Sequence, residues 1–275
     1  MTYTYYTPKG GLPDQTERLY DSALFTPSYA VIPATSMTDI VTSFLPLWQN
    51  ARAWILARPL SGFAETFAQL IVELAPGGGS PQPEPDPDGE GVIFVVNGTV
   101  TIGIGEDVHI LKPGGFAYLS PGENWAISNQ SDHPATFHWI RKKYEQVDGI
   151  EKPPTFFTSD AETPPESMPD THDKWATTRF FEQGDLRYDM HVHIVTFQPG
   201  GLIPFAETHV MEHGLYVLQG HARYLLNSDW HEVGPGDFMW LRAFCPQACE
   251  AQGSTPFRYL LYKDVNRHPK LKVTS

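Results

Sequence analysis

Cysteine is almost absent from this sequence, and so is any long apolar run. The 275 residues include only 2 cysteines, Cys245 and Cys249, too few for a disulfide framework in a chain of this length. Their spacing lacks the second pair of thiolates that a structural zinc site requires, so we expect small thiols that line a pocket. No apolar run approaches the roughly 20 residues that cross a bilayer as a helix, which argues against a membrane-spanning protein.

Basic residues are also scarce. Lysine and arginine number 19 against 32 aspartates and glutamates, which gives a formal net charge of −13. A nucleic acid or an acidic membrane surface requires a basic face on its partner, so we expect neither as a partner. Residues 1–27 contain no basic stretch followed by an apolar one, which is the pattern of a secretory signal. We therefore expect a cytoplasmic protein.

Helical periodicity is scarce as well, and short strand-like runs take its place. Residues 92–96, 100–104 and 116–119 are rich in β-branched and aromatic side chains and are bounded by Gly, Pro, Asn or Asp. With 25 prolines and 23 glycines, turns are dense. This composition predicts an all-β fold of many short strands, as in a jelly-roll barrel.

The chain contains an internal repeat. Residues 79–98 and 201–220 have the same length, begin and end with glycine, and close on an apolar strand; residues 113–119 (PGGFAYL) then match 235–241 (PGDFMWL). Such self-similarity predicts two tandem barrels. We expect an N-terminal extension at 1–60 packed on the barrels, a first barrel at 61–148, a linker rich in Pro, Ser, Thr and acidic residues at 149–179, and a second barrel at 180–275.

The second copy of the repeat carries side chains that can bind a metal ion. Glu207, His209 and His213 stand at strand-like spacing, so alternation can bring them to one face. The strand predicted after the turn at Gly234 leads to Gln247, a neutral oxygen donor. One carboxylate, two imidazoles and one amide suit Mn²⁺ or Fe²⁺ at least as well as Zn²⁺.

The first copy lacks these donors. Aligning the glycines places Pro85, Pro87 and Gly91 opposite the three candidate ligands Glu207, His209 and His213 of the second copy, and Trp125 opposite Gln247. None of the four residues of the first copy can bind a metal. The first barrel is therefore predicted to have a structural or oligomer-forming role, and the second barrel to be the active one.

The spacing resembles the cupin superfamily, and one bicupin family within it more closely. The first cupin motif, G-x5-H-x-H-x3-E-x6-G, matches residues 201–220 with Glu207 and His213 exchanging the usual His and Glu. Residues 206–220, 244–253 and 258–269 are similar to the (S)-ureidoglycine aminohydrolase family, supported by 189–201. The resemblance implies a manganese enzyme of purine and allantoin degradation, which converts ureidoglycine to ureidoglycolate and ammonia.

The resemblance also implies roles for individual residues. The metal ligands would be Glu207, His209, His213 and Gln247, with Zn²⁺ or Fe²⁺ as alternatives to Mn²⁺. The substrate, a small ureide, would contact Glu207, Gln247, Tyr224, Tyr259 and Lys263, of which Glu207 and Lys263 are the candidate catalytic groups. A homo-oligomer is the expected assembly.

Alternation assigns faces to several neighbouring side chains. Tyr259, Leu261 and Lys263 share one face of the strand predicted at 258–263 and can point into the barrel together. His191 and His193 also alternate inward, where we expect supporting roles beside the site. Glu212 adjoins a ligand but belongs to the opposite face, so we expect it not to bind the metal.

Other functions stay open on the sequence alone. A sugar-acid isomerase resembling the ketodeoxyuronate isomerases has a similar tandem build, although the amide ligand and Lys263 disfavour it. A dioxygenase can use a mixed His and carboxylate site that holds Fe²⁺, and anaerobic turnover separates it from a hydrolase. A non-catalytic binding cupin would use the metal barrel as a ligand sensor.

Overall fold

Strands form nearly all of the regular structure. The computed structural model describes residues 3–12, 23–59, 63–265 and 267. The helices whose bounds lie within these residues are two single turns of 3-10 helix, η1 (Ala34–Ser36) and η2 (Asp39–Val41). No helix in the described part of the chain is long and apolar enough to cross a membrane. The prediction of an all-β fold is confirmed.

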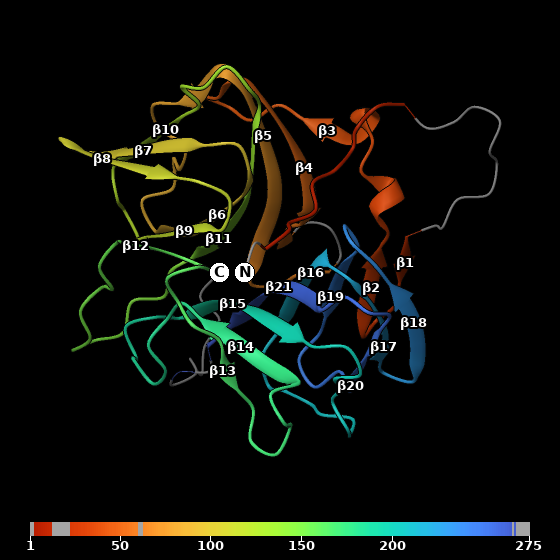
Figure 1. The fold of residues 1–275 in the computed structure, drawn as a ribbon. Coiled ribbons are helices and arrows are strands. Elements are labelled where there is room, and N and C mark those ends of the chain that lie inside the picture. The colour runs from red at the N-terminus through yellow and green to blue at the C-terminus, as the bar shows by residue number, and fades with distance from the viewer. Residues whose placement is uncertain (1–2, 13–22, 60–62, 266, 268–275) are drawn as a thin grey trace.

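The N-terminal half forms a ten-stranded sheet (Figure 1). In chain order its strands are β3 (Thr42–Ser43), β4 (Gln49–Ala57), β5 (Phe67–Ser80), β6 (Gly89–Asn97), β7 (Val100–Ile104), β8 (Asp107–Leu111), β9 (Gly115–Leu119), β10 (Trp125–Ser128), β11 (Ala135–Lys143) and β12 (Phe156–Ser159). They pair in the order β12-β9-β6-β11-β5-β10-β7-β8, while β4 also pairs with β5 and β3 with β4.

The C-terminal half, with β1 and β2 from the N-terminal segment, forms an eight-stranded sheet and a three-stranded sheet. Their strands are β1 (Leu24–Phe25), β2 (Tyr29–Ile32), β13 (Glu166–Ser167), β14 (Trp175–Arg179), β15 (Met190–Phe197), β16 (His213–Gln219), β17 (His221–Leu226), β18 (Asp229–Val233), β19 (Phe238–Leu241), β20 (Gln247–Gln252) and β21 (Phe257–Asp264). The orders are β1-β2-β19-β16-β21-β15-β14-β13 and β18-β17-β20.

The two halves repeat one topology. The order β9-β6-β11-β5 in the first half corresponds to β19-β16-β21-β15 in the second, and β10-β7-β8 corresponds to β20-β17-β18. All of the strand pairings in these sets are antiparallel. The repeat seen in the sequence is thus a repeat of structure, and the prediction of two tandem jelly-roll barrels is confirmed.

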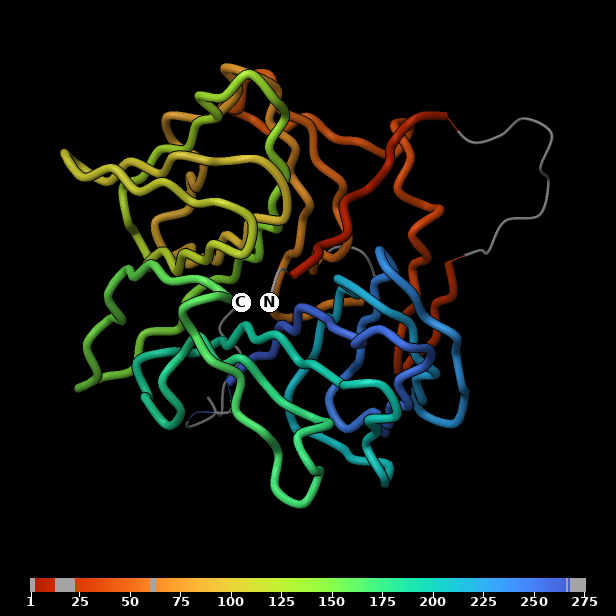
Figure 2. The backbone as a smooth tube through the Cα atoms, in the orientation of Figure 1, coloured from red at the N-terminus to blue at the C-terminus, as the bar shows by residue number. Residues whose placement is uncertain are grey.

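Segments outside the repeats add strands to both barrels. From the N-terminal extension, β2 pairs with β19 in the second barrel, whereas β4 pairs with β5 in the first. From the stretch 149–179, β12 pairs with β9 in the first barrel and β14 with β15 in the second. Figure 2 shows the red N-terminal segment passing beside both halves of the molecule. The extension and the connecting stretch therefore tie the barrels together.

Apolar side chains of the described residues form three cores. One fills the first barrel, one fills the second, and the largest lies between them. Strand β6 shows how one strand serves two cores, because Ile93 and Val95 point into the first barrel while Val92, Phe94 and Val96 face the second. A strand buried on both faces has a continuous apolar sequence instead of an alternating one, which explains the run at 92–96.

Candidate metal and substrate site

A pocket of about 170 Å³ in the second barrel brings most of the predicted site residues together. It is lined by Met168, Trp175, Thr177, Arg179, His193, Val195, Glu207, His209, Met211, His213, Leu215, Gln247, Tyr259, Leu261 and Lys263. Of the residues implied by the family resemblance, only Tyr224 is outside this lining. A larger cavity, of about 610 Å³, lies where Glu212 points and contains none of the predicted ligands. We therefore place the candidate site in the smaller pocket.

Glu207 and Gln247 are brought together by their backbones. They form an isolated antiparallel bridge, in which each N–H donates to the carbonyl of the other residue at 2.9 Å. Residues opposite each other in such a pair present their side chains on the same side. The Gln247 amide Nε2 accordingly donates to Glu207 Oε1 at 3.4 Å.

The two histidines approach this pair from different local structures. His209 Nε2 lies 3.3 Å from Glu207 Oε1, and its ring centroid lies 5.1 Å from that of His213. His213 is the first residue of β16, whereas Glu207 and His209 precede the strand. Alternation along one strand, the basis of the sequence argument, is therefore not what gathers these residues. The bridge to Gln247 and the chain path before β16 do so instead.

His213 is held in its neutral form. It pairs with Lys263 in the sheet and is buried. Burial, with smaller contributions from the nearby His209 and Lys263, lowers its pKa to about 3. A neutral imidazole keeps a lone pair that can bind a metal ion.

Two buried tyrosines adjoin Gln247. The Tyr224 hydroxyl donates to Gln247 Oε1 at 2.8 Å and lies 3.5 Å from the Tyr259 hydroxyl. Burial raises the pKa of both phenols well above the usual range, so both stay protonated. Tyr224 thus lies behind the amide and orients it, while Tyr259 reaches the pocket itself.

Lys263 and Arg179 bring positive charge to the pocket. Tyr259, Leu261 and Lys263 all line it, as alternation along β21 predicted. Burial lowers the pKa of Lys263, and the charge of Arg179 lowers it further. Arg179 was not among the predicted site residues; it lies on β14 and donates from Nε to a Glu166 carboxylate oxygen at 3.1 Å. The strand that carries Arg179 was not recognised, because residues 149–179 were predicted to be a linker.

Other predicted neighbours also have definite places. His191 and His193 pair with Lys263 and Leu261 across the sheet, and His193 lines the pocket. None of their ring nitrogens has a hydrogen-bond partner within the described part of the chain. Burial lowers the pKa of His191 to about 4 and that of His193 well below its usual value.

The two cysteines are free and buried. Burial raises the pKa of both thiols, which makes them unreactive. Cys245 lines the larger cavity and not the candidate site, and neither thiol reaches the pocket with Glu207.

The donor set suits a divalent cation in chemistry, although its geometry is not that of a closed metal site. No group of three or more His, Cys, Asp and Glu side chains in the described residues could hold an ion. The candidate set includes an amide, and Glu207 and His209 contact each other directly. Gln247 Oε1 accepts one hydrogen bond and so keeps a second lone pair. Carboxylate, amide and neutral imidazole groups can bind Mn²⁺, Fe²⁺ or Zn²⁺ together.

Comparisons with known proteins agree with this arrangement. The model of the Cupin domain family matches residues 70–141 and 193–262, one match in each barrel. An (S)-ureidoglycine aminohydrolase of Arabidopsis thaliana is 33% identical over 263 residues, which is 94% of this chain and 81% of that protein. The corresponding Escherichia coli enzyme is 29% identical and covers 83% of this chain and 86% of its own length.

A solved structure is still more similar. It is a protein from Pseudomonas aeruginosa described as a candidate glyoxylate-induced protein, 57% identical, with a TM-score of 0.93, covering 99% of this chain and 100% of that one. The two matches to the cupin model and the identity to curated relatives along most of the chain lead to one assignment. This protein belongs to the cupin superfamily and, within it, to the (S)-ureidoglycine aminohydrolase family.

Proposed function

We propose that this protein hydrolyses (S)-ureidoglycine to (S)-ureidoglycolate and ammonia, as a step in the breakdown of purine-derived ureides. The observation that carries the proposal is one pocket in which Glu207, Gln247 and Lys263 converge with two histidines. Relatives similar over most of the chain are named for this activity. We expect a small ureide as substrate and neither nucleic acid nor membrane as partner, given the net charge of −13.

The metal that we propose is Mn²⁺, held by Glu207, His209, His213 and Gln247. When bound, it supplies a Lewis acid and fixed positions for oxygen and nitrogen atoms of the substrate. The Glu207 Oε1 and His209 Nε2 atoms lie 3.3 Å apart, a separation that two ligands of one ion can have. Tyr224 supports metal binding by holding the Gln247 amide in place.

The cations of the pocket suit the substrate carboxylate. Lys263 and the Arg179 guanidinium both line the pocket. Since Arg179 is also oriented by Glu166, we assign it to anchoring the carboxylate, where a guanidinium can donate two parallel hydrogen bonds. This anchor fixes the reacting carbon relative to the groups that move protons.

Hydrolysis breaks the bond from carbon to the amino nitrogen and forms a bond from carbon to a water oxygen. A proton from water must reach the departing nitrogen, which leaves as ammonia. We assign its movement to the Glu207 carboxylate, as acceptor, and the Lys263 ammonium, as donor. The lowered pKa of Lys263 makes its proton easier to release at neutral pH.

Two further parts of the proposal concern the environment of the protein. We place it in the cytoplasm, where a reducing environment suits its two free thiols. We also propose a homo-oligomer, because strand β8 ends the order of its sheet with exposed Val108 and Ile110. Light scattering of the purified protein tests the assembly.

The decisive experiment measures ammonia release from freshly prepared (S)-ureidoglycine. The protein is stripped with a chelator and reloaded with Mn²⁺, Zn²⁺ or Fe²⁺, and each form is tested with and without oxygen. We expect turnover that requires metal, is highest with Mn²⁺ and is unaffected by removing oxygen. Turnover that stops without oxygen would support a dioxygenase, and no ammonia release with any ion would refute the proposal.

A further inference from the structure

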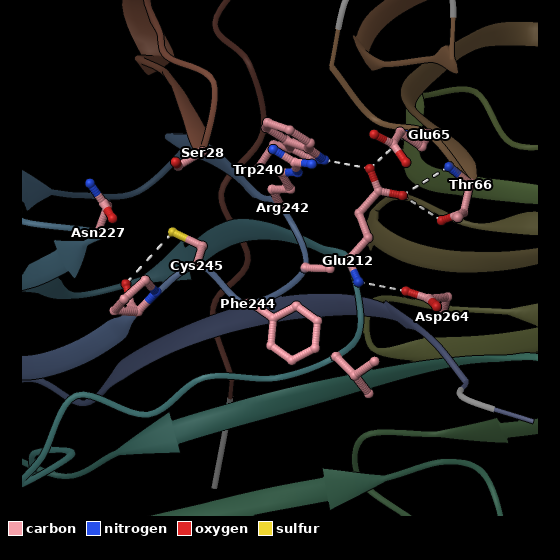
Figure 3. A pocket seen from close by; sticks show the side chains of 13 residues that line it. Ser28, Glu65, Thr66, Glu212, Asn227, Trp240, Arg242, Phe244, Cys245 and Asp264 are labelled. Atoms are coloured by element: carbon pink, nitrogen blue, oxygen red, sulfur yellow. Dashed lines mark hydrogen bonds between the residues drawn. The ribbon is translucent and has the colours of Figure 1, made fainter.

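Glu212 links the outer face of strands β16 and β21, which carry His213 and Lys263, to the first barrel. This residue directly precedes His213 in the chain, and its side chain points away from the site. Figure 3 shows its carboxylate directed toward Glu65, Thr66 and Trp240. Oε1 accepts from the Glu65 N–H at 2.6 Å and from Trp240 Nε1 at 2.5 Å. Oε2 accepts from the Thr66 N–H at 2.8 Å and its hydroxyl at 2.5 Å.

The same network reaches both neighbours of Lys263. The N–H of Glu212 donates to Asp264 Oδ1 at 2.6 Å, and the Thr66 hydroxyl lies 2.9 Å from the Tyr262 hydroxyl. Tyr262 and Asp264 flank Lys263 on β21. A single threonine next to the start of β5 in the first barrel is therefore linked to residues adjacent to both His213 and Lys263.

Apolar packing reinforces the contact at Gly214. The Phe67 ring stacks on Tyr262 with centroids 3.9 Å apart. A Cβ placed on Gly214 would lie 2.5 Å from Phe67 Cζ, closer than real Cβ contacts. Glycine at this position thus allows Phe67 to lie directly against the backbone of the residue that follows His213.

We propose that Glu212 is a positioning residue and that Thr66 and Phe67 of the first barrel form with it a cross-barrel clasp that sets the ends of β16 and β21. His213 and Lys263 are cross-strand partners on the inner face, and the clasp holds the residues next to both of them on the outer face. A carboxylate with all four acceptor positions filled by donors has one orientation, so the backbone that carries it has little freedom. The first barrel thereby takes part in the site without supplying a ligand.

The proposal rests on the proposed function only where it names Mn²⁺ and the substrate. Groups that orient metal ligands are typically worth about 10- to 100-fold in metal affinity or activity. The clasp acts one residue further from the metal than such groups, so its loss is expected to lie at the lower end of this range.

The test compares a hydroxyl deletion in the clasp with one at a buried contact of the N-terminal extension. Thr66→Val removes the hydroxyl and keeps the volume, and Thr66→Ser keeps the hydroxyl. The matched control is Tyr5→Phe, which removes a hydroxyl that donates at 2.8 Å to Asp160, a buried carboxylate paired with Arg258 and outside the pocket. Glu212→Gln is the stronger variant, because its NH₂ group must face donors. The readouts are Mn²⁺ affinity by electron paramagnetic resonance, hydrogen exchange of segments 207–215 and 260–264 without metal, kcat and KM, and Tm.

We expect Thr66→Val to weaken Mn²⁺ binding about 10-fold and to speed exchange in both segments. Thr66→Ser should restore wild-type values, and Tyr5→Phe should lower Tm without changing Mn²⁺ affinity or exchange. Equal behaviour of Thr66→Val and Tyr5→Phe, or unchanged exchange in Thr66→Val, overturns the clasp, whatever the substrate. If the wild type releases no ammonia but Thr66→Val still exchanges faster than Tyr5→Phe, the proposed function is refuted and the clasp is retained.

Discussion

The two barrels share one strand order but fill their interiors differently. Arg141 pairs with Gly91 in the first barrel, as Lys263 pairs with His213 in the second. Trp125 begins β10, and Gln247 begins the corresponding β20. The first barrel thus has glycine and tryptophan where the second has two candidate metal ligands.

Aromatic rings occupy the space in the first barrel. Trp139 has its ring centroid 5.4 Å from that of Trp48 and 6.4 Å from that of Trp125. Arg141 lies 5.1 Å from the Trp139 ring and forms an ion pair with Glu84. Its charge is thereby neutralised within the protein, whereas Lys263 faces an open pocket. One scaffold thus holds either a packed aromatic core or a polar site, depending on a few inward positions.

The largest effect is expected at Glu207, a candidate metal ligand whose aligned residue in the first barrel cannot bind a metal. Glu207→Ala removes a ligand and a proton acceptor, and should lower kcat/KM by about 10³-fold or more and abolish tight Mn²⁺ binding. The control is Pro85→Ala, the aligned position of the first barrel, which should change neither. Steady-state ammonia release and metal analysis measure both. Similar losses in the two variants would contradict the assignment of the site to the second barrel.

The aromatic core of the first barrel is expected to contribute to the free energy of unfolding and not to metal binding. Trp139 is 3% exposed, and Trp139→Ala should lower the free energy of unfolding by about 3–5 kcal/mol, through lost burial and a residual cavity. Urea denaturation measures this loss. Mn²⁺ affinity of the folded variant should stay at the wild-type value. A variant of normal stability that binds Mn²⁺ poorly would show that the core serves the site and not the fold.

The aligned cations sharpen the comparison of chemistry. Lys263→Met should lower kcat/KM about 100-fold, the usual scale of a lost proton-transfer group. Arg141→Met removes the corresponding positive charge from the first barrel and leaves Glu84 without its ion-pair partner. It should destabilise the protein while kcat/KM of the folded fraction stays constant. Full activity of Lys263→Met would remove this residue from the mechanism.

Arg179 tests the anchoring of the substrate. Arg179→Gln should raise KM about 10-fold and change kcat by less than about 2-fold, because a carboxylate anchor contributes to binding in ground and transition states alike. Glu166→Gln, which removes the charge of its partner on β13, should have a smaller effect in the same direction. A drop in kcat at constant KM would instead indicate a role in the chemical step.

The smallest expected effect is that of the buried histidines of both barrels on the pH dependence of stability. Burial lowers the pKa of His138 in the first barrel to about 3 and that of His191 in the second to about 4. The unfolded chain therefore binds more protons between these values and about 6.5. Stability should be unaffected above pH 6.5 and decline below it, by at most about 1.4 kcal/mol per pH unit for each histidine.

Urea denaturation of the metal-free protein between pH 8 and 4 measures this slope. His138→Gln removes one titrating group from the first barrel and should make the slope shallower, although it changes the stability at neutral pH as well. An unchanged slope would show that His138 does not charge on unfolding in this range. The same substitution at His191 provides the counterpart in the second barrel.

Much of the candidate site could be predicted because it depends on local chemistry. A glutamate, two histidines and a glutamine in the second repeat identify the barrel that holds the pocket. Alternation on β21 correctly placed Tyr259, Leu261 and Lys263 on one face, since inward and outward positions of a strand differ by one residue. Arg179 was missed, because its strand lies in a stretch whose composition resembles a linker.

The contacts between barrels were beyond sequence reasoning. Thr66 bonds to Glu212, 146 positions away in the chain, and no local pattern in either segment predicts the other. The pairing of β2 with β19 and of β12 with β9 could not be predicted for the same reason. A short strand pairs with whichever edge the tertiary fold brings near it.

The strand-rich architecture, the duplication and the barrel that carries the candidate donor atoms could all be read from the sequence, because turn residues, periodicity and donor atoms act over a few positions. The folded structure was needed to show that a backbone bridge places Glu207 beside Gln247 and that residues of the first barrel bond to Glu212, next to His213. Burial, pairing with distant segments and the enclosure of charge are properties of the folded chain, in which hydrogen bonds and packing join residues far apart in sequence.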